Sequence, residues 1–189
     1  GKRERSAVAK PIKRSTASNL LWLGIPAALA IAIVAVAALS GRGDDATSGE
    51  IEGVREFSSL SRNHTTDTVD YPQTPPVGGD HDPQWAACDG RVYDEPVRDE
   101  NAVHSLEHGA VWISYQPGLD DSELDSLREK VEGAPYTMMS PFADQSDPLM
   151  MTAWGAQLTV DGADDPRIDQ FLAQYRQGPQ TPEPGASCS

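Results

Sequence analysis

The stretch that decides the fold is His104-Ser105-Leu106-Glu107-His108-Gly109-Ala110-Val111-Trp112-Ile113-Ser114-Tyr115. Its second half, residues 110–115, is a continuous apolar run, which predicts a strand buried on both faces. The polar half before it holds two histidines four residues apart, with Glu107 between them. On a helical turn this spacing puts both imidazoles on one side, where they could form half of a metal site or an acid–base pair.

The residues after this stretch predict alternating helices and strands. Apolar residues recur with helical spacing over residues 120–132, and a second such helix starts at residue 164 and ends at Gly178-Pro179. Residues 136–140 and 148–154 have the composition of strands, and residues 157–160 either continue the second strand or pair with it. The order strand, helix, strand, strand, helix predicts an α+β fold, with helices against one face of a small mixed sheet.

The half of the domain before residue 104 is expected to be irregular. Apolar residues every third position over residues 51–62 suit either a short helix or an extended segment. Residues 64–71 are rich in Thr, Val and Tyr, which predicts a short exposed strand. The Pro- and Gly-rich residues 72–83 predict a loop, and His81 lies in this loop, where binding residues often occur.

The N-terminal region predicts a membrane anchor. Residues 1–19 hold six basic side chains and one acid, and residues 20–39 contain no charge. Twenty residues of helix span about 30 Å, which is enough to cross a bilayer, and the basic flank places the N-terminus in the cytoplasm. The alternative is a cleaved signal peptide, because Ala35-Val36-Ala37 resembles a cleavage site.

These features divide the chain into five segments. They are a basic cytoplasmic tail (1–19), a transmembrane helix (20–39), a linker (40–50), an extracytoplasmic α+β domain (51–178) and a Pro-rich tail (179–189). Beyond the anchor remain nine of the 15 basic and 28 of the 29 acidic residues. Such an acidic surface repels phosphate backbones, so nucleic-acid binding is not expected.

The two cysteines, Cys88 and Cys188, both fall in the extracytoplasmic part. A disulfide between them would tie the Pro-rich tail to the domain, in a compartment where disulfides persist. The alternative is that Cys88 is a free thiolate ligand, although an unpaired thiol outside the cell is prone to oxidation.

The histidines and methionines predict a transition-metal site. All four histidines and all four methionines lie in the acidic domain, the methionines as two adjacent pairs. Imidazole with thioether suits copper, and imidazole with carboxylate suits zinc, so copper is favoured and zinc is the alternative. The predicted ligands are His81, His104, His108 and Met150. In the alternative interpretation the methionines only fill the core.

Two other interpretations of the histidine pair remain open. His104-x-x-Glu107-His108 matches the H-x-x-E-H pattern of inverted zinc proteases, with Glu107 as general base, although that motif belongs in a long helix. The histidines could instead be structural residues beside a turn. No Gly-rich phosphate loop, no G-x-S-x-G motif and no C-x-x-C motif is present.

Spaced motifs over residues 50–189 carry a family resemblance. They are Tyr71–His81, Cys88, Tyr93, Pro96-Val97, Val103–Trp112, Ser140-Pro141, Ala153-Trp154-Gly155 and Pro182–Cys188. Together they resemble a bacterial, mainly actinobacterial, family of unknown function, number 3105. The resemblance implies a membrane-anchored extracytoplasmic protein with no established activity, in genomic company suggestive of copper or respiratory-chain handling.

Three functions follow as hypotheses. The first is a single-span membrane protein whose acidic domain holds or delivers a transition metal, without enzymatic turnover. The second is an accessory subunit of a larger membrane complex, such as a respiratory complex, with structural histidines. The third is a zinc hydrolase that uses Glu107.

Overall fold

The computed structural model describes residues 49–189. The predicted cytoplasmic tail, transmembrane helix and most of the linker fall within residues 1–48 and lie outside the described residues. Among residues 49–189, no helix has both the length and the apolar character needed to cross a bilayer.

The described residues form an α+β domain with a six-stranded mixed sheet and three helices. In chain order the elements are β1 (Arg55–Glu56), β2 (Asp89–Val92), α2 (Asp99–Glu107), β3 (Val111–Tyr115), α3 (Asp121–Val131), β4 (Thr137–Pro141), β5 (Leu149–Ala153), β6 (Ala156–Val160) and α4 (Arg167–Tyr175). The strand order across the sheet is β1-β6-β5-β3-β4-β2.

Strand β3 lies inside the sheet, as its apolar sequence predicts. It pairs in parallel with β4, with Trp112 opposite Met138, and antiparallel with β5, with Trp112 opposite Thr152. All five residues of β3 are buried. Helix α3 makes the crossover that a parallel pair requires, and it buries Leu127 and Val131.

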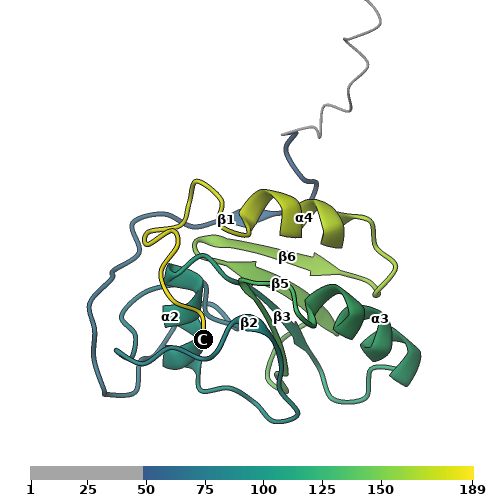
Figure 1. Cartoon of the computed structure of the whole chain (residues 1–189), viewed down its shortest axis with the longest axis horizontal. Helices are drawn as coiled ribbons and strands as arrows, with labels where there is room; N and C mark the ends of the chain where they lie inside the picture. The colour runs from purple at the N-terminus through teal and green to yellow at the C-terminus, as the bar shows by residue number, and fades with distance from the viewer. Residues whose placement is uncertain (1–48) are drawn as a thin grey trace, which may run out of the picture. The chain divides into compact units, whose positions relative to one another are not determined.

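The two faces of the sheet are covered differently. Helices α3 and α4 pack on one face around residues such as Ile113, Met151 and Phe171. Helix α2 packs on the other face, where Leu106 contacts a core that includes Trp112 (Figure 1). The expectation of helices against a single face therefore holds for α3 and α4 but not for α2.

Helix α2 was not predicted from the sequence, for a physical reason. Its buried residues include Glu100, His104, Ser105 and Glu107, so polar side chains occupy positions where an apolar stripe would signal a helix. Polar groups buried in this way must find partners within the protein. Helix α2 is thus the element that brings polar chemistry into the interior.

The structure also decides other sequence expectations. Residues 156–160 form a separate strand that pairs with β5, which confirms the second of the two predicted alternatives. Residues 64–71 form no strand; His64 makes only an isolated bridge to His81. Residues 51–62 contain the short strand β1, in agreement with the extended alternative, and residues 72–83 are irregular as predicted.

The predicted disulfide between Cys88 and Cys188 is present and closes a separation of 100 residues. It belongs to the core beside α2 and holds the C-terminal tail, yellow in Figure 1, against that helix. Cys88 N–H also donates to Cys188 O at 2.7 Å. The bond indicates an oxidising compartment, as expected for an extracytoplasmic domain.

Candidate metal centre

Four side chains converge beside the C-terminal end of α2. His64, His81, His104 and Glu107 each offer one ligand atom, and these atoms all lie within 4.8 Å of one another. His81, His104 and Glu107 are buried, whereas the His64 side chain is half exposed. The group is therefore a buried His/Glu cluster with one side open to solvent, and its donor atoms could hold a metal ion.

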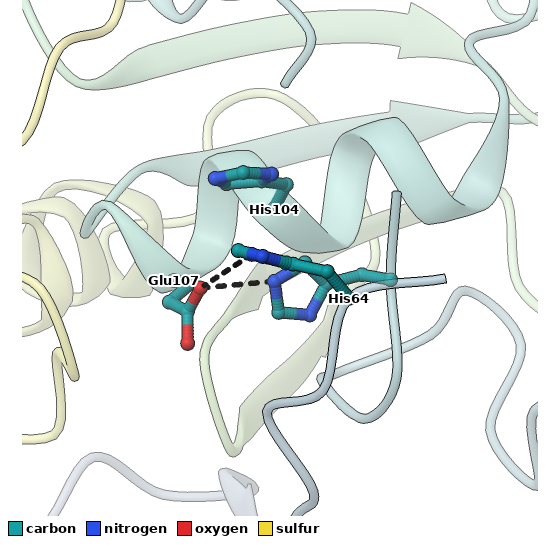
Figure 2. A group of neighbouring side chains, drawn as sticks. His64, His104 and Glu107 are labelled. Carbon is teal, nitrogen blue, oxygen red and sulfur yellow. Dashed lines mark hydrogen bonds and ion pairs between the residues drawn. The ribbon is translucent and has the colours of Figure 1, made fainter. Parts of the chain in front are cut away.

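Helix α2 contributes two of the four side chains, and the C-terminal tail fixes the end of this helix. His104 and Glu107 are three residues apart, so they lie on one helical face. Figure 2 shows both projecting from the helix towards the segment that carries His64. The tail satisfies the last carbonyls of α2, because Glu183 N–H donates to Glu107 O at 3.0 Å and the Gln177 amide donates to His108 O.

Two irregular segments contribute the other two side chains. Thr65 N–H donates to His81 O at 2.7 Å, and His81 N–H donates to Asn63 O at 3.0 Å, which fixes the two histidine-bearing segments side by side. Arg98, which directly precedes α2, adds a further contact, since it pairs with the carboxylate of Asp82 at 2.5 Å. It also donates to the carbonyl of Thr66 at 3.2 Å. The cluster is therefore built from three separate segments.

Backbone carbonyls orient the imidazoles. The Nδ1 atoms of His81 and His104 lie 2.8 Å and 2.6 Å from the carbonyl oxygens of Gly79 and Asp82. A carbonyl oxygen can only accept, so each Nδ1 carries the proton and leaves Nε2 for a metal. This arrangement is the usual support for metal-binding histidines.

Glu107 lies at the centre of the cluster. Its Oε2 is 2.9 Å from His81 Nε2 and 3.9 Å from His64 Nε2 (the dashed lines in Figure 2). Its Oε1 is 3.5 Å from Arg62 Nε, so one oxygen is oriented by Arg62 while the other faces the imidazoles. A metal ion bound at this point would replace the direct contact between His81 Nε2 and Glu107 Oε2.

The distances suit a small transition-metal ion. Zinc–nitrogen bonds of about 2.0–2.1 Å in a tetrahedron place the ligand atoms about 3.3 Å from each other. The separations of 2.9 Å and 3.9 Å at Glu107 lie on either side of that value, and separations of up to 4.8 Å elsewhere in the cluster would have to shorten by as much as about 1.5 Å around the ion.

Burial also keeps His104 in the form that binds metal. Desolvation lowers the pKa of His104 to about 4, and the neighbouring His108, His81 and His64 act in the same direction. The hydrogen bond to Asp82 opposes this shift but does not reverse it. His104 is therefore neutral near pH 7, with a lone pair available on Nε2.

The structure brings two of the four predicted ligands, His81 and His104, into the cluster. His108 directly follows α2, and its Nδ1 lies 2.5 Å from the carbonyl oxygen of Ser187. Its ring is beside His104, but it is not one of the four clustered groups.

Met150 lies in the sheet and not beside His81. It is fully buried in β5, opposite Ser114 and Thr159. The residue after β5 that packs against His81 is Trp154, with ring centroids 6.0 Å apart. Met150 lies three residues, about 10 Å of strand, before Ala153, the C-terminal end of β5 next to Trp154. The buried position agrees with the alternative in which the methionines fill the core.

Sequence reasoning missed His64 as a ligand and considered Glu107 only as a catalytic base. His64 is 40 residues before His104, and no spacing rule links two irregular segments across such a gap. The one available signal was the small number of histidines. The chain has only four, and three of them belong to the cluster.

Comparison with protein families assigns the chain to one family. The sequence model of a family described as "Protein of unknown function (DUF3105)" matches residues 63–189. This match covers more than half of the chain, and the protein belongs to that family. All four cluster residues lie within the matched region. No curated protein and no solved structure matches the chain.

Proposed function

We propose that this domain binds a divalent transition metal through His64, His81, His104 and Glu107. The observation that carries the proposal is the convergence of three imidazoles and one carboxylate within 4.8 Å, three of them buried. Burying ionisable groups is costly unless they are paired or bind a metal. Backbone bonds that hold the Nδ1 atoms of His81 and His104 add the orientation that metal sites use.

Copper and zinc are the two metals that this donor set suits. The four-residue cluster contains no thioether, so a methionine ligand does not distinguish the two metals here. A nitrogen and oxygen donor set accepts both Cu²⁺ and Zn²⁺, and Cu²⁺ binds more tightly to a given site of this kind. Copper therefore stays ahead of zinc in the proposal.

A holding or delivery role, without turnover, is supported by the state of Glu107. Both of its oxygens are engaged, one by Arg62 and the other by the histidines, so it acts as a ligand instead of a free base. His64, half exposed, provides the side from which a metal could enter or leave. The predicted transmembrane helix would keep this site on the extracytoplasmic side of the membrane, near a membrane complex that receives the metal.

Metal analysis of the full-length chain tests the proposal. The chain, purified in detergent and stripped with a chelator, is titrated with Zn²⁺ and separately with Cu²⁺. We expect one tightly bound ion per chain, with tighter binding of Cu²⁺, and loss of this binding in a His64→Ala, His81→Ala double variant. Equal metal content in the wild type and the double variant would overturn the proposal.

Co-purification from membranes addresses the role. Recovery of the chain with a metal-dependent membrane complex, reduced for the double variant, is the result expected of a delivery protein. Recovery as a lone monomer would count against delivery and leave storage as the role.

A further inference from the structure

His104 of the four-residue cluster also pairs with His108, a histidine outside the cluster, beneath an exposed tryptophan. The rings of His104 and His108 are 4.5 Å apart between centroids, at an interplanar angle of 81°. The indole of Trp85 packs against both, with centroid distances of 5.7 Å to His104 and 5.1 Å to His108. In the part of the chain that the structure describes, Trp85 is the one large apolar side chain left exposed, at 37 %.

Hydrogen bonds to backbone carbonyls orient both rings of this pair. The Nδ1 atom of His108 donates to Ser187 O at 2.5 Å, and that of His104 donates to Asp82 O at 2.6 Å. Each Nε2 therefore keeps its lone pair. Within residues 49–189, Nε2 of His108 has no hydrogen-bond partner, and the residue as a whole is buried, at 4 % exposure.

We infer that His104 and His108 form a second metal position, which binds a monovalent copper ion through their Nε2 atoms beneath the face of Trp85. This position goes beyond the divalent site of the proposed function and shares only His104 with it. Because one Nε2 atom cannot serve both ions, occupation of one position is expected to weaken the other.

The chemistry of the pair favours a monovalent ion. Two neutral imidazoles and an indole provide no negative charge to compensate a divalent ion, and the nearby carboxylate of Glu107 faces His81. An aromatic face attracts a cation within about 6 Å of its centroid, and this attraction is strongest when the cation has shed its water. A monovalent ion sheds water at lower cost than a divalent one, and imidazole is a good ligand for copper.

The test follows the fluorescence of Trp85 during an anaerobic titration with Cu⁺. The full-length chain in detergent is compared with a Trp85→Phe variant, so that the difference isolates the signal of Trp85 from that of Trp154 and the other tryptophans. We expect quenching that depends on Trp85 and saturates at one Cu⁺ per chain.

Two variants locate the ion. His108→Asn removes Nε2 but retains an amide N–H that can donate to Ser187, and it should weaken Cu⁺ binding at least about tenfold. Glu107→Gln disrupts the four-residue cluster and should leave the Trp85 signal intact. Absence of the signal, insensitivity to His108→Asn, or an equal loss in Glu107→Gln would each overturn the inference.

Zinc binding separates this inference from the proposed function. One tightly bound Zn²⁺ in the wild type, retained in His108→Asn, supports the four-residue site whatever Cu⁺ does. A Trp85 signal that depends on His108, in a chain that binds no Zn²⁺, would support the second position and overturn the proposed function.

Discussion

The Nε2 atom of His81 lies 2.9 Å from Oε2 of Glu107, although the two residues are 26 positions apart in the chain. His81 comes from an irregular loop and Glu107 from the last turn of α2. Both side chains are almost completely buried. This contact joins the loop and the helix and places a carboxylate at the centre of three imidazoles.

Replacing Glu107 by Gln should weaken metal binding strongly and leave the fold in place. The amide has the size of the carboxylate but no charge, so the cluster loses its one anionic ligand. Loss of a residue that merely supports a ligand costs about 10–100-fold in affinity, and loss of a ligand should cost more than about 100-fold. Zn²⁺ titration calorimetry measures this change. Glu129→Gln, at an exposed position of α3, is the control and should bind as the wild type does.

Arg62→Ala should have a smaller effect on the same measurement. Arg62 contacts Glu107 at 3.5 Å and is 54 % exposed, so it orients the carboxylate without binding the ion. We expect the affinity for Zn²⁺ to fall about tenfold with unchanged stoichiometry. The matched control is Arg91→Ala, which removes an equally exposed arginine that pairs with Asp89 on β2. Similar losses in both variants would rule out a specific role for Arg62.

Replacing both Cys88 and Cys188 by Ser should destabilise the domain. The disulfide closes a loop of about 100 residues, for which the chain-entropy treatment gives about 4 to 5 kcal/mol in the free energy of unfolding. Denaturant unfolding of wild type and variant measures the difference. A reducing agent should lower the stability of the wild type towards that of the variant and leave the variant unchanged.

Gly109→Ala should destabilise more than Gly118→Ala. Both glycines have a positive φ, +94° and +104°, so both substitutions introduce backbone strain of about 1–2 kcal/mol. A Cβ at Gly109 would also collide with Gln177 and Thr181 of the tail, whereas one at Gly118 meets nothing within 4 Å. Moving the Gln177 side chain away would break its hydrogen bonds with His108 O and Gly185 N–H, which should add about 1–3 kcal/mol for Gly109 alone. Equal unfolding free energies for the two variants would contradict the close packing of the tail.

The domain should become less stable as the pH rises from about 4 to about 6, because Asp99 loses its proton over this range. Burial, with smaller contributions from Glu100 and Asp144, raises the pKa of Asp99 from 3.8 to about 6. The folded state therefore holds this proton more tightly than the unfolded state. The resulting stabilisation is complete below about pH 4 and is lost as the pH passes through the folded pKa.

Asp99→Asn removes this titration. The variant should be more stable than the wild type at pH 7, by at most about 3 kcal/mol for a shift of this size, and the difference should disappear near pH 4. Denaturant unfolding across this pH range measures it. Asp70→Asn, at an exposed carboxylate, is the control. A difference between Asp99→Asn and wild type that does not vary with pH would show that its origin is not this titration.

Local sequence patterns predicted the regular part of the fold. The apolar run before residue 116 forms β3, and the residues with helical spacing after residue 120 form α3. Both were predictable because each pattern indicates directly which side of the element is buried. Helix α2 was missed because four of its buried residues are polar. A periodicity of apolar residues cannot reveal a helix whose buried side carries histidines and carboxylates.

The candidate site was predicted only in part. His81 and His104 were named as ligands from their residue type and position, whereas His64 was not. The ligand role of Glu107 depends on the loop that brings His81 to it. Met150 was expected to face the histidines, but the register of β5 places it opposite Ser114.

The sequence by itself determined the family, the disulfide partners, the core strand and the types of ligand available. These follow from local composition and from the small number of cysteines and histidines. Tertiary structure alone decided which histidines meet, because His64, His81 and α2 are joined by hydrogen bonds between segments distant in sequence. Such contacts depend on the path of irregular loops, and no period in the sequence records that path.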